Sequence, residues 1–537
     1  MFLDEMQFKE LDLDFVFDRI QVDTPYGEIE KRNASPVKRQ EIEALEREFE
    51  DLEKVIKLLN DKRYEFLELK SVYKNMKQLG STYERLEAEE TLSVTELFEF
   101  KVMAMLMRQA MGVMERIRWN ENGLRYGLKP VLQVVELLDP EKTGTQSFYI
   151  YNAYSESLRE IRRQMDRLKA KLATHKASVQ EMLNEKSLKI RANGEVHVSK
   201  TNAEQVEFAK SCDALAYQSE MPTMIIYRVE QSTDVLEEVE RLTTLEEEEE
   251  YRVRTELSLK LREHLNVMIE NSRKIGKTDY LIARANFSRG FDCVRPKINL
   301  NGHILIKAGR HLKVAHRLSV EKKAYTPVDV DINSKVTLIT GANMGGKTVS
   351  LKMIGLIVAM AHYGIFVPCK SADVGLFDFM FISVGDSQSI DMGLSTFGGE
   401  IHKIGKVLKH VNMKGFILID ELARGTNPME GYAISHALID HLTQSDFVTV
   451  ITTHYDGLTL IEGVDHYQVL GLSGVDFENL SGEKGMMLLH ELMDYRLSKV
   501  SSITEIPKDA IRISEFMGLD AAIINKAKEL LGGSNGE

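Results

Sequence analysis

The segment that most constrains this chain is Gly341 to Thr348, which reads GANMGGKT and follows a run of strand formers, Val336 to Thr340. Glycines let the backbone curl until successive N–H groups face one anion, and a following helix adds its positive N-terminal end. Val349 to Gly364 is long and apolar enough to be that helix, and Gly364 suits its C-terminal stop. Strand, loop and helix together predict a phosphate-binding site in a nucleotide-handling domain.

Individual loop residues have separate expected tasks. Gly341, Gly345 and Gly346 allow the tight backbone curl. Lys347 is expected to reach the β- and γ-phosphates of ATP, and Thr348 to offer its hydroxyl to Mg²⁺. A Gly-rich turn before a helix also occurs by chance, but the flanking strand and helix argue against that explanation.

A second apolar run supplies acidic residues. Gly415 to Glu421 reads GFILIDE and lies about seventy residues after the loop. It predicts a buried parallel strand beside the loop strand, whose carboxyl end delivers Asp420 toward Mg²⁺ and Glu421 toward a water in line with the γ-phosphate. Because one carboxylate can position the metal while the other activates water, the pair predicts hydrolysis as well as binding.

A third predicted strand, Phe447 to Thr453, ends at His454. A neutral imidazole at the carboxyl end of a strand can sense the γ-phosphate by hydrogen bonding. A lone histidine after a strand is more often an ordinary loop residue, so His454 counts only together with the other two segments.

With these segments in order, the stretch from about Gly309 to Leu460 resembles the ATPase domain of the MutS family. GANMGGKT resembles the family's GPNMGGK[ST] loop, in which Asn343 matches a phosphate-side asparagine. DELARGT, Asp420 to Thr426, resembles the segment DE-x-x-x-GT, and TTHY, Thr452 to Tyr455, resembles THY. LSTF, Leu394 to Phe397, is similar to the family's STF motif.

The resemblance implies a dimer, of this chain with itself or with a MutS-like paralogue. In the family, composite sites form between two ATPase domains, and the STF motif reaches across to the partner's nucleotide. That role would fall to Ser395 and Thr396, which are otherwise a polar turn ahead of a helix. Tyr325 is placed like an aromatic that stacks on adenine.

Departures from the family pattern are also informative. Ala342 replaces the usual proline but removes no N–H that phosphate needs, so ATP binding is expected to survive. GRHLKV, Gly309 to Val314, lacks the proline of the similar GRHP segment. The stretches QSIDMGLSTF and GTNPMEG resemble the second bacterial branch of the family more than its mismatch-repair branch.

The whole chain has 537 residues, 43% hydrophobic and 28% charged, which predicts a globular protein of several domains. No apolar run of membrane-spanning length and no secretion signal is found, so we expect a cytoplasmic protein without a membrane partner. Cys212, Cys293 and Cys369 are far apart and lack metal-ligand spacing, as expected of thiols in a reducing cytosol.

The expected fold is multidomain: a mostly helical core with a long helical lever and clamp, then an α/β P-loop ATPase domain of ABC type and a helical dimerisation segment. Two charged, heptad-like arms, Tyr149 to Lys186 and Thr233 to Ile275, flank a hairpin signal at Asn193-Gly194 and a further strand in MPTMIIYRVE. This resembles the MutS lever and clamp. A coiled-coil insertion with a small sheet at its tip and no ligand is the alternative. The predicted boundaries are 1–148 for the core, 149–275 for the lever and clamp, 276–308 for the return to the core, 309–470 for the ATPase domain and 471–537 for the dimerisation segment.

Mismatch-recognising members begin with a domain that carries an aromatic-x-Glu motif, for which we expect no room before the core. Phe8-Lys9-Glu10 matches those letters only. We likewise expect no room after the ATPase domain for the nuclease-like module of longer second-branch members. Ile506 to Leu531 instead resembles the two-helix segment by which family ATPase domains dimerise.

Charge weakens the expectation of DNA binding, which depends on Lys and Arg neutralising phosphates. The formal net charge is −13, and Glu246 to Glu250 form an acidic run. Across the clamp tip six cations face six anions: Lys186, Lys189, Arg191, Lys200, Lys210 and Arg228 against Glu195, Glu204, Glu207, Asp213, Glu220 and Glu230.

Two functions therefore stay open. The first is a dimeric ATP-driven clamp on DNA that does not recognise mismatches with a wedge. The second is an ATP-driven remodelling factor for a protein client, because short MutS-like proteins resemble the ATPase subunit of factors that reactivate adenosylcobalamin-dependent aminomutases.

Overall fold

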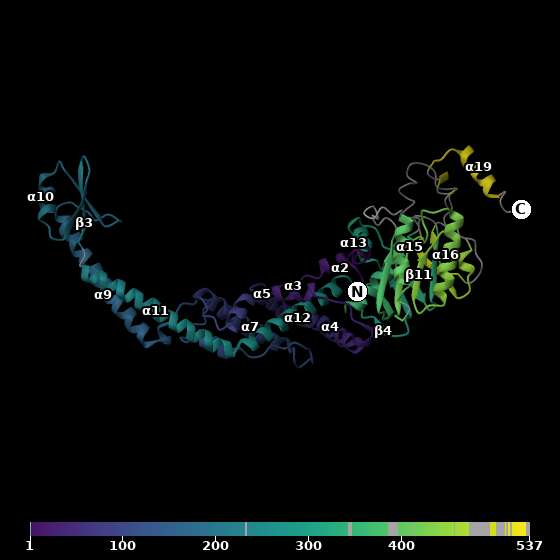
Figure 1. Ribbon diagram of the computed structural model, residues 1–537, viewed down its shortest axis with the longest axis horizontal. Coiled ribbons are helices and arrows are strands. Elements are labelled where there is room, and N and C mark those ends of the chain that lie inside the picture. The colour runs from purple at the N-terminus through teal and green to yellow at the C-terminus, as the bar shows by residue number, and fades with distance from the viewer. Residues whose placement is uncertain are drawn as a thin grey trace. The chain divides into compact units, whose positions relative to one another are not determined.

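A computed structural model of the chain describes residues 2–230, 233–341, 346–384, 396–410, 412–455, 457–471, 494–500, 511, 514–515 and 518–532 (Figure 1). The chain divides into two compact units. Unit 1 is Met1–Lys74, Val113–Gly127 and Ile275–Glu537, and unit 2 is Asn75–Gly112 and Leu128–Lys274. The long helices α7 (Val94–Ile117) and α12 (Leu265–Gly290) each contribute residues to both units.

Unit 1 begins with amphipathic helices. They are α1 (Glu5–Glu10), α2 (Leu13–Arg19), α3 (Pro25–Arg32), α4 (Ile42–Asp61) and α5 (Arg63–Lys74). The α4 helix buries residues three and four positions apart, as its sequence predicts. Phe8 of α1 packs against Phe17 and Tyr363, with ring centroids 5.3 and 6.2 Å away. Phe8 is therefore a packing residue, in agreement with the view that Phe8-Lys9-Glu10 matches the wedge motif by letters alone.

The central element of unit 1 is a six-stranded sheet. Its strands are β7 (Val336–Thr340), β9 (Phe379–Ser383), β10 (Gly415–Ile419), β11 (Val448–Thr452), β12 (Val464–Gly471) and β13 (Asp494–Lys499). They lie in the order β13-β12-β7-β11-β10-β9, and all neighbours are parallel except β12 and β13. The three strands expected around the loop are confirmed, but the placement of β10 beside β7 is wrong, because β11 lies between them.

The strands β7, β9, β10 and β11 are buried on both faces, which explains why they read as continuous apolar runs. Phe416 and Leu418 of β10 face the core that contains α14 (Lys347–His362), whereas Ile417 and Ile419 face the core beneath α15 (Thr396–Val407) and α16 (Pro428–Thr443). The helix predicted from Val349 thus begins at Lys347.

A second sheet of unit 1 has the order β4-β8-β5-β6. Its strands are β4 (Lys297–Asn299), β5 (Ile304–Gly309), β6 (Val328–Ile332) and β8 (Ser371–Gly375), and α13 (Leu312–Val320) separates β5 from β6. Of the predicted dimerisation segment, Ile506 to Leu531, only part lies within the described residues. There α19 (Ala521–Gly532) exposes Ile523 and Leu530.

Unit 2 contains a long antiparallel helix pair, α9 (Glu156–Glu185) and α11 (Thr233–Glu263), whose members lie side by side (Figure 1). Arg162 of α9 forms ion pairs with Glu246 and Glu250 of α11, at 2.7 and 2.5 Å. Both predicted arms are helical, but their bounds differ from the prediction: the first begins at Glu156, and the second ends at Glu263, where a separate helix, α12, follows from Leu265. Part of the acidic run is thus neutralised within the pair. The other helices of this unit are α6 (Gly80–Glu87), α8 (Leu132–Leu138) and α10 (Ala203–Ser211).

A small antiparallel sheet lies at the end of this helix pair (Figure 1). It has the order β1-β3-β2, with β1 (Glu195–Ser199), β2 (Leu215–Glu220) and β3 (Met224–Val229). The turn predicted at Asn193-Gly194 is present, with Gly194 at a φ of 82°. The arm before it is not a strand, however, because only one bridge, Ile190 to Val196, joins it to β1. Strand β2 was missed by the sequence pattern.

Among the described residues, no set of three or more His, Cys, Asp or Glu side chains is arranged to hold a metal ion. In the same part of the chain, no helix combines the length and apolar character needed to cross a membrane. Cys212, Cys293 and Cys369 are free thiols.

The helices of unit 2 are fixed by a buried ion pair. Lys101 of α7 is fully buried, and its Nζ donates to Asp139 Oδ1 at 3.2 Å and to the Ser147 carbonyl and the Tyr151 hydroxyl at 3.0 Å. Burial opposes the ionisation of Asp139, but hydrogen bonds from Gly144, Thr143 and Lys101 outweigh it and lower the pKa of Asp139 to about 2. The Asp139 carboxylate therefore stays ionised at neutral pH.

We expect Lys101→Met to destabilise α7 and its neighbours by about 3 kcal/mol, because it leaves Asp139 buried without its counter-ion. Native-state hydrogen exchange should show α7 amides exchanging about a hundredfold faster. Lys260→Met removes a half-exposed lysine of α11 that pairs with Glu256. This variant should change the free energy of opening measured by hydrogen exchange by less than about 0.5 kcal/mol. Equal protection in the two variants would contradict the assigned role of Lys101.

Candidate nucleotide-binding site

The parallel strands bring several polar residues to one edge of the six-stranded sheet. Gly341 follows β7, Asp420 and Glu421 follow β10, and Thr452 ends β11. Lys347 begins the helix after β7. Because ligands of open α/β sheets bind beyond the carboxyl ends of the strands, this edge is where a nucleotide is expected.

Lys347 is buried, with 4% of its surface exposed, and its Nζ donates to the Gly341 carbonyl at 2.8 Å. Burial lowers the pKa of Lys347, and the nearby Glu421 and Asp420 carboxylates partly offset this effect. The amine is thus held over the start of the loop, where phosphate oxygens could replace the carbonyl as its acceptor.

Gly346 precedes α14 with a φ of 88°, a conformation that favours glycine. A Cβ at this position would lie 2.8 Å from Cδ1 of Tyr495 on β13. Tyr495, which is half-buried, therefore packs directly on the backbone that enters the helix. The sequence analysis missed Tyr495, because it lies about 150 residues beyond the loop and belongs to no recognisable motif.

Four hydrogen bonds connect the ends of β9, β10 and β11 with one another and with α14. Thr348 Oγ1 donates to Asp420 Oδ2 at 2.8 Å, and Thr452 Oγ1 donates to Asp420 Oδ1 at 2.6 Å. Thr452 Oγ1 also accepts the Glu421 N–H at 2.8 Å, and the Asp420 N–H bonds to the Ser383 carbonyl at 2.8 Å. Both carboxylate oxygens of Asp420 are thus engaged by hydroxyls, one of them on the phosphate-loop helix.

Glu421 has an unusual backbone, with a φ of 52°, and Ala423 follows at 61°. Left-handed conformations of residues other than glycine typically cost about 1–3 kcal/mol and gather at functional sites. The carboxylate of Glu421 is mostly buried and forms an ion pair with Arg424 at 3.2 Å. The sharp turn after β10 therefore directs Asp420 and Glu421 differently although they are adjacent in sequence.

Glu400 of α15 is a further acidic residue at this edge that the sequence analysis missed. Its carboxylate accepts a hydrogen bond from the Ala423 N–H and lies near Asp420. Burial, reinforced by the negative charge of Asp420, raises the pKa of Glu400 to about 7, although the Ala423 N–H and Lys403 oppose this shift. The sequence around Glu400 reads as the first turn of an ordinary helix and does not indicate that its carboxylate lies near Asp420.

Of the remaining predicted residues, His454 and Tyr325 are described by the structure, whereas the others lie wholly or partly outside the described residues. His454 lies exposed after β11, with its ring 4.6 Å from that of Tyr455. Tyr325 lies between α13 and β6, where its hydroxyl accepts the His311 N–H at 3.0 Å. Outside the described part are the loop residues Asn343 and Gly345, the residue Ser395 and the side chain of Thr396, whose backbone begins α15.

Comparison with known proteins identifies the family. The profile described as MutS domain V matches residues 337–532, which include the sheet edge just described. A curated Endonuclease MutS2 of Halothermothrix orenii is 32% identical over 401 residues, which cover 72% of this chain and 47% of that protein. The chain belongs to the MutS family. The resemblance to its second branch agrees with the name of this relative.

Other curated relatives carry the same name. The Endonuclease MutS2 of Shouchella clausii is 30% identical over 392 residues, 71% of this chain and 46% of that protein. That of Ruminiclostridium cellulolyticum is 34% identical over 285 residues, 52% of this chain and 33% of that protein. This MutS-family chain thus spans less than half the length of each of these relatives.

We expect Glu400→Gln to stabilise the protein selectively at higher pH. The folded-state pKa of Glu400, about 7, exceeds its ordinary value of 4.5, so its stabilising contribution is complete below pH 4.5 and is lost as pH rises through 7. Glutamine keeps an acceptor for the Ala423 N–H but carries no charge. The melting temperature should therefore rise at pH 8 and change little at pH 4.5, and an equal shift at both pH values would contradict this assignment.

Proposed function

We propose that this MutS-family chain is an ATPase that binds and hydrolyses ATP at the carboxyl edge of its six-stranded sheet and acts on DNA. The observation that carries the proposal is the set of hydrogen bonds joining Thr348, Asp420, Thr452 and the Glu421 backbone. It links the helix that would cradle phosphate to the two carboxylates that hydrolysis needs.

The side chains at this edge fit a magnesium ion. Thr348 and Asp420 present a hydroxyl and a carboxylate within hydrogen-bond distance of each other, and such oxygen ligands are those that Mg²⁺ prefers. When bound, Mg²⁺ would neutralise charge on the β- and γ-phosphates. Thr348 and Asp420 would hold the ion, and Lys347 would contact the phosphates.

Glu421 is proposed to orient and deprotonate the attacking water. The Thr452 hydroxyl fixes the backbone of Glu421, and the left-handed turn separates its carboxylate from that of Asp420. His454 and Tyr325 keep their proposed tasks as γ-phosphate sensor and adenine-stacking residue. Asn343, Ser395 and Thr396 complete the site as the family resemblance implies, the last two across a dimer with a second copy or a paralogue.

Action on DNA is proposed from the relatives, which are named as endonucleases. The ion pairs between lysine and glutamate side chains at the tip of unit 2 are compatible with action on DNA. Lys186 pairs with Glu204 and Lys200 with Glu220, at 2.7 and 2.5 Å. Of the other tip cations counted from the sequence, Arg191 lies near Glu195 and Lys210 near Glu220, and each helps to lower the pKa of that carboxyl. We propose that Lys189 and Arg228 contact phosphates.

The alternative, reactivation of an aminomutase, gains no support from the comparisons, which name no such client. The proposal also includes transmission of ATP-dependent changes to the α9–α11 pair. Its support is covalent continuity, since α7 and α12 each run without a break from one unit into the other.

We expect Glu421→Gln to bind ATP with near-normal affinity but to hydrolyse it about a hundredfold or more slowly, because the water loses its base. Lys347→Ala should lose ATP binding itself. Glu430→Gln removes an exposed carboxylate from the first turn of α16 and serves as the matched control. The measurements are equilibrium binding of labelled ATP and phosphate release under single-turnover conditions. A Glu421→Gln protein with normal turnover would show that another group is the base.

The same variant tests the DNA part of the proposal. With ATP bound and hydrolysis slowed, the Glu421→Gln protein should be retained on duplex, branched or single-stranded DNA in gel-shift assays at physiological salt. The form of DNA that retains this variant should also stimulate the ATPase rate of the wild-type protein. Basal ATPase without stimulation or retention by any DNA form would exclude DNA as the substrate and favour a protein client.

Thr452→Val tests the hydrogen-bond network. Valine keeps the shape of threonine but removes the hydroxyl shared by Asp420 and the Glu421 N–H, so hydrolysis should slow at least about tenfold with ATP affinity little changed. Thr449→Val, on the same strand, is the control, because the buried Thr449 hydroxyl has no hydrogen-bond partner within the described part of the chain. Single-turnover rates that fall equally in both variants would mean that Thr452 acts through strand packing alone.

A further inference from the structure

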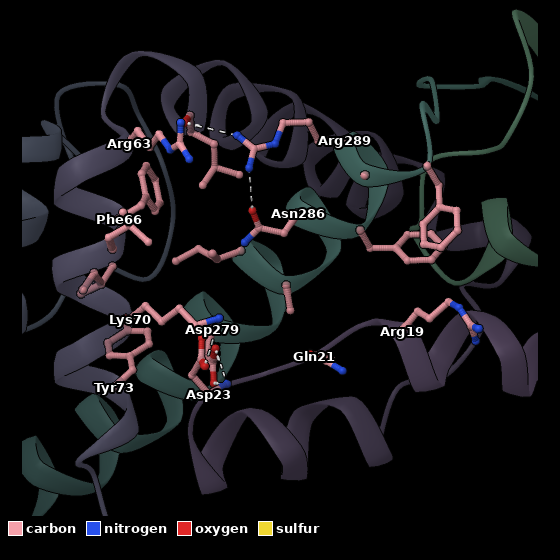
Figure 2. Close-up of a pocket in the computed structure, with 18 residues that line it drawn as sticks. Arg19, Gln21, Asp23, Arg63, Phe66, Lys70, Tyr73, Asp279, Asn286 and Arg289 are labelled. Atoms are coloured by element: carbon pink, nitrogen blue, oxygen red, sulfur yellow. Dashed lines mark hydrogen bonds and ion pairs between the residues drawn. The ribbon is translucent and has the colours of Figure 1, made fainter. Parts of the chain in front are cut away.

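A cavity of about 400 Å³ lies within unit 1, away from the strand ends that form the nucleotide site (Figure 2). Residues of α5 and α12 form its walls, and the link between α2 and α3 closes one side. Its volume is within the range of small-molecule sites. None of the predicted ATPase residues lines it, so the proposed function leaves the cavity unexplained.

The acidic groups of this cavity are already occupied. Asp279 accepts hydrogen bonds from the Asp23 N–H at 3.0 Å and from the Thr24 N–H and hydroxyl at 2.7 Å each. Burial raises the pKa of Asp279 to about 6, although these hydrogen bonds oppose the shift. Asp23 forms an ion pair with Lys70 at 3.5 Å. Neither carboxylate is therefore left to pair with the arginines that line the cavity.

Three arginines, Arg19, Arg63 and Arg289, line the same cavity, and none has a carboxylate partner among the described residues. Arg19 lies over the Phe15 ring at the far side. Arg63 begins α5, and its guanidinium group and that of Arg289 point toward one another at one end of the cavity (Figure 2). The chain as a whole is acidic, so this local excess of positive charge is distinctive.

The contacts of Arg289 are weak and neutral. Its guanidinium donates to the Leu59 carbonyl, to Asn60 Oδ1 and to Asn286 Oδ1, each at 3.4 Å. Two guanidinium groups that face each other without an anion repel, whereas an anion between them would accept charge-assisted hydrogen bonds from both. The arrangement is therefore that of an anion site.

Beyond these arginines the cavity has an apolar floor. Phe66, Tyr73 and Phe287 are buried beneath it, and Leu69 and Phe291 complete the surface. A ligand that fills the cavity must therefore combine an anionic end with an apolar or aromatic body.

We propose that this cavity binds a phosphorylated small molecule, with its phosphate between Arg63 and Arg289 and its body against Phe66 and Phe287. A phosphate dianion matches two guanidinium forks from different helices, because its oxygens point in tetrahedral directions, whereas a carboxylate offers two oxygens in one plane. The apolar floor and the small volume favour such a ligand over the backbone of duplex DNA, which needs exposed cations and no apolar cavity. The phosphate-bearing molecule is either a nucleotide or another aromatic phosphate.

The test uses the full chain carrying Lys347→Ala, in which the proposed ATP site is disabled. The result for the cavity therefore does not depend on whether the proposed ATPase function is correct. Calorimetric titrations compare phenyl phosphate, inorganic phosphate, AMP and benzoate. We expect saturable binding of phenyl phosphate, one per chain, at least tenfold tighter than that of inorganic phosphate or benzoate. Tighter binding of AMP than of phenyl phosphate would identify a nucleotide as the ligand.

Adding Arg63→Ala and Arg289→Ala should weaken phenyl phosphate binding at least tenfold without changing the melting temperature, since both side chains are exposed. Arg47→Ala removes an exposed arginine of α4 outside the cavity and should leave binding unchanged. Absence of saturable binding by every probe, or equal binding in the double variant and the Arg47→Ala control, would overturn the proposal. Displacement of phenyl phosphate by a short DNA duplex would overturn the small-molecule assignment and assign the cavity to DNA.

Discussion

The hydroxyl of Thr452 is the contact on which the arrangement of the proposed nucleotide site depends. Because β11 is inserted between β7 and β10, Asp420 is one strand farther from the phosphate loop than a direct neighbour would be. Thr452 spans that interval by donating to Asp420 and accepting from the Glu421 backbone, at 2.6 and 2.8 Å. Asp420 can then reach Thr348 on α14, so three consecutive strands act as one rigid support.

The helix that begins at Lys347 is also fixed at its other end. Arg284 of α12 donates to the Gly364 carbonyl at 2.9 Å and pairs with Glu48 of α4 at 2.6 Å. Burial opposes the charge of Arg284, but the pairing with Glu48 outweighs it and raises the pKa of this guanidinium. A buried arginine that satisfies both a helix terminus and a carboxylate is costly to disrupt. Helix α14 is thus held at its first turn through Thr348 and beyond its last turn by α4 and α12.

The sequence predicts the parts of this site that local patterns encode. Apolar runs identified β7, β10 and β11, and the residues after them supplied Lys347, Thr348, Asp420 and Glu421. The order of the strands was not predictable, because buried parallel strands all read as similar apolar runs and their sequences do not indicate which strands are neighbours. Tyr495 and Glu400 were missed for a related reason, since only the fold brings them from distant segments to the loop and to the turn after β10. The domain boundaries and the tasks of individual site residues stay predictions.

The α12 helix connects the proposed phosphate cavity with the support of the nucleotide site. Asp279 and Arg289 line the cavity, and Arg284 lies between them in sequence and holds the Gly364 carbonyl. A ligand that draws Arg63 and Arg289 together favours one position of α12 over others, and the same helix positions the end of α14. Coupling between two sites requires only that each ligand prefer the same arrangement of a shared element. If α12 is that element, phosphate binding and ATP binding must alter each other's affinity by the same factor.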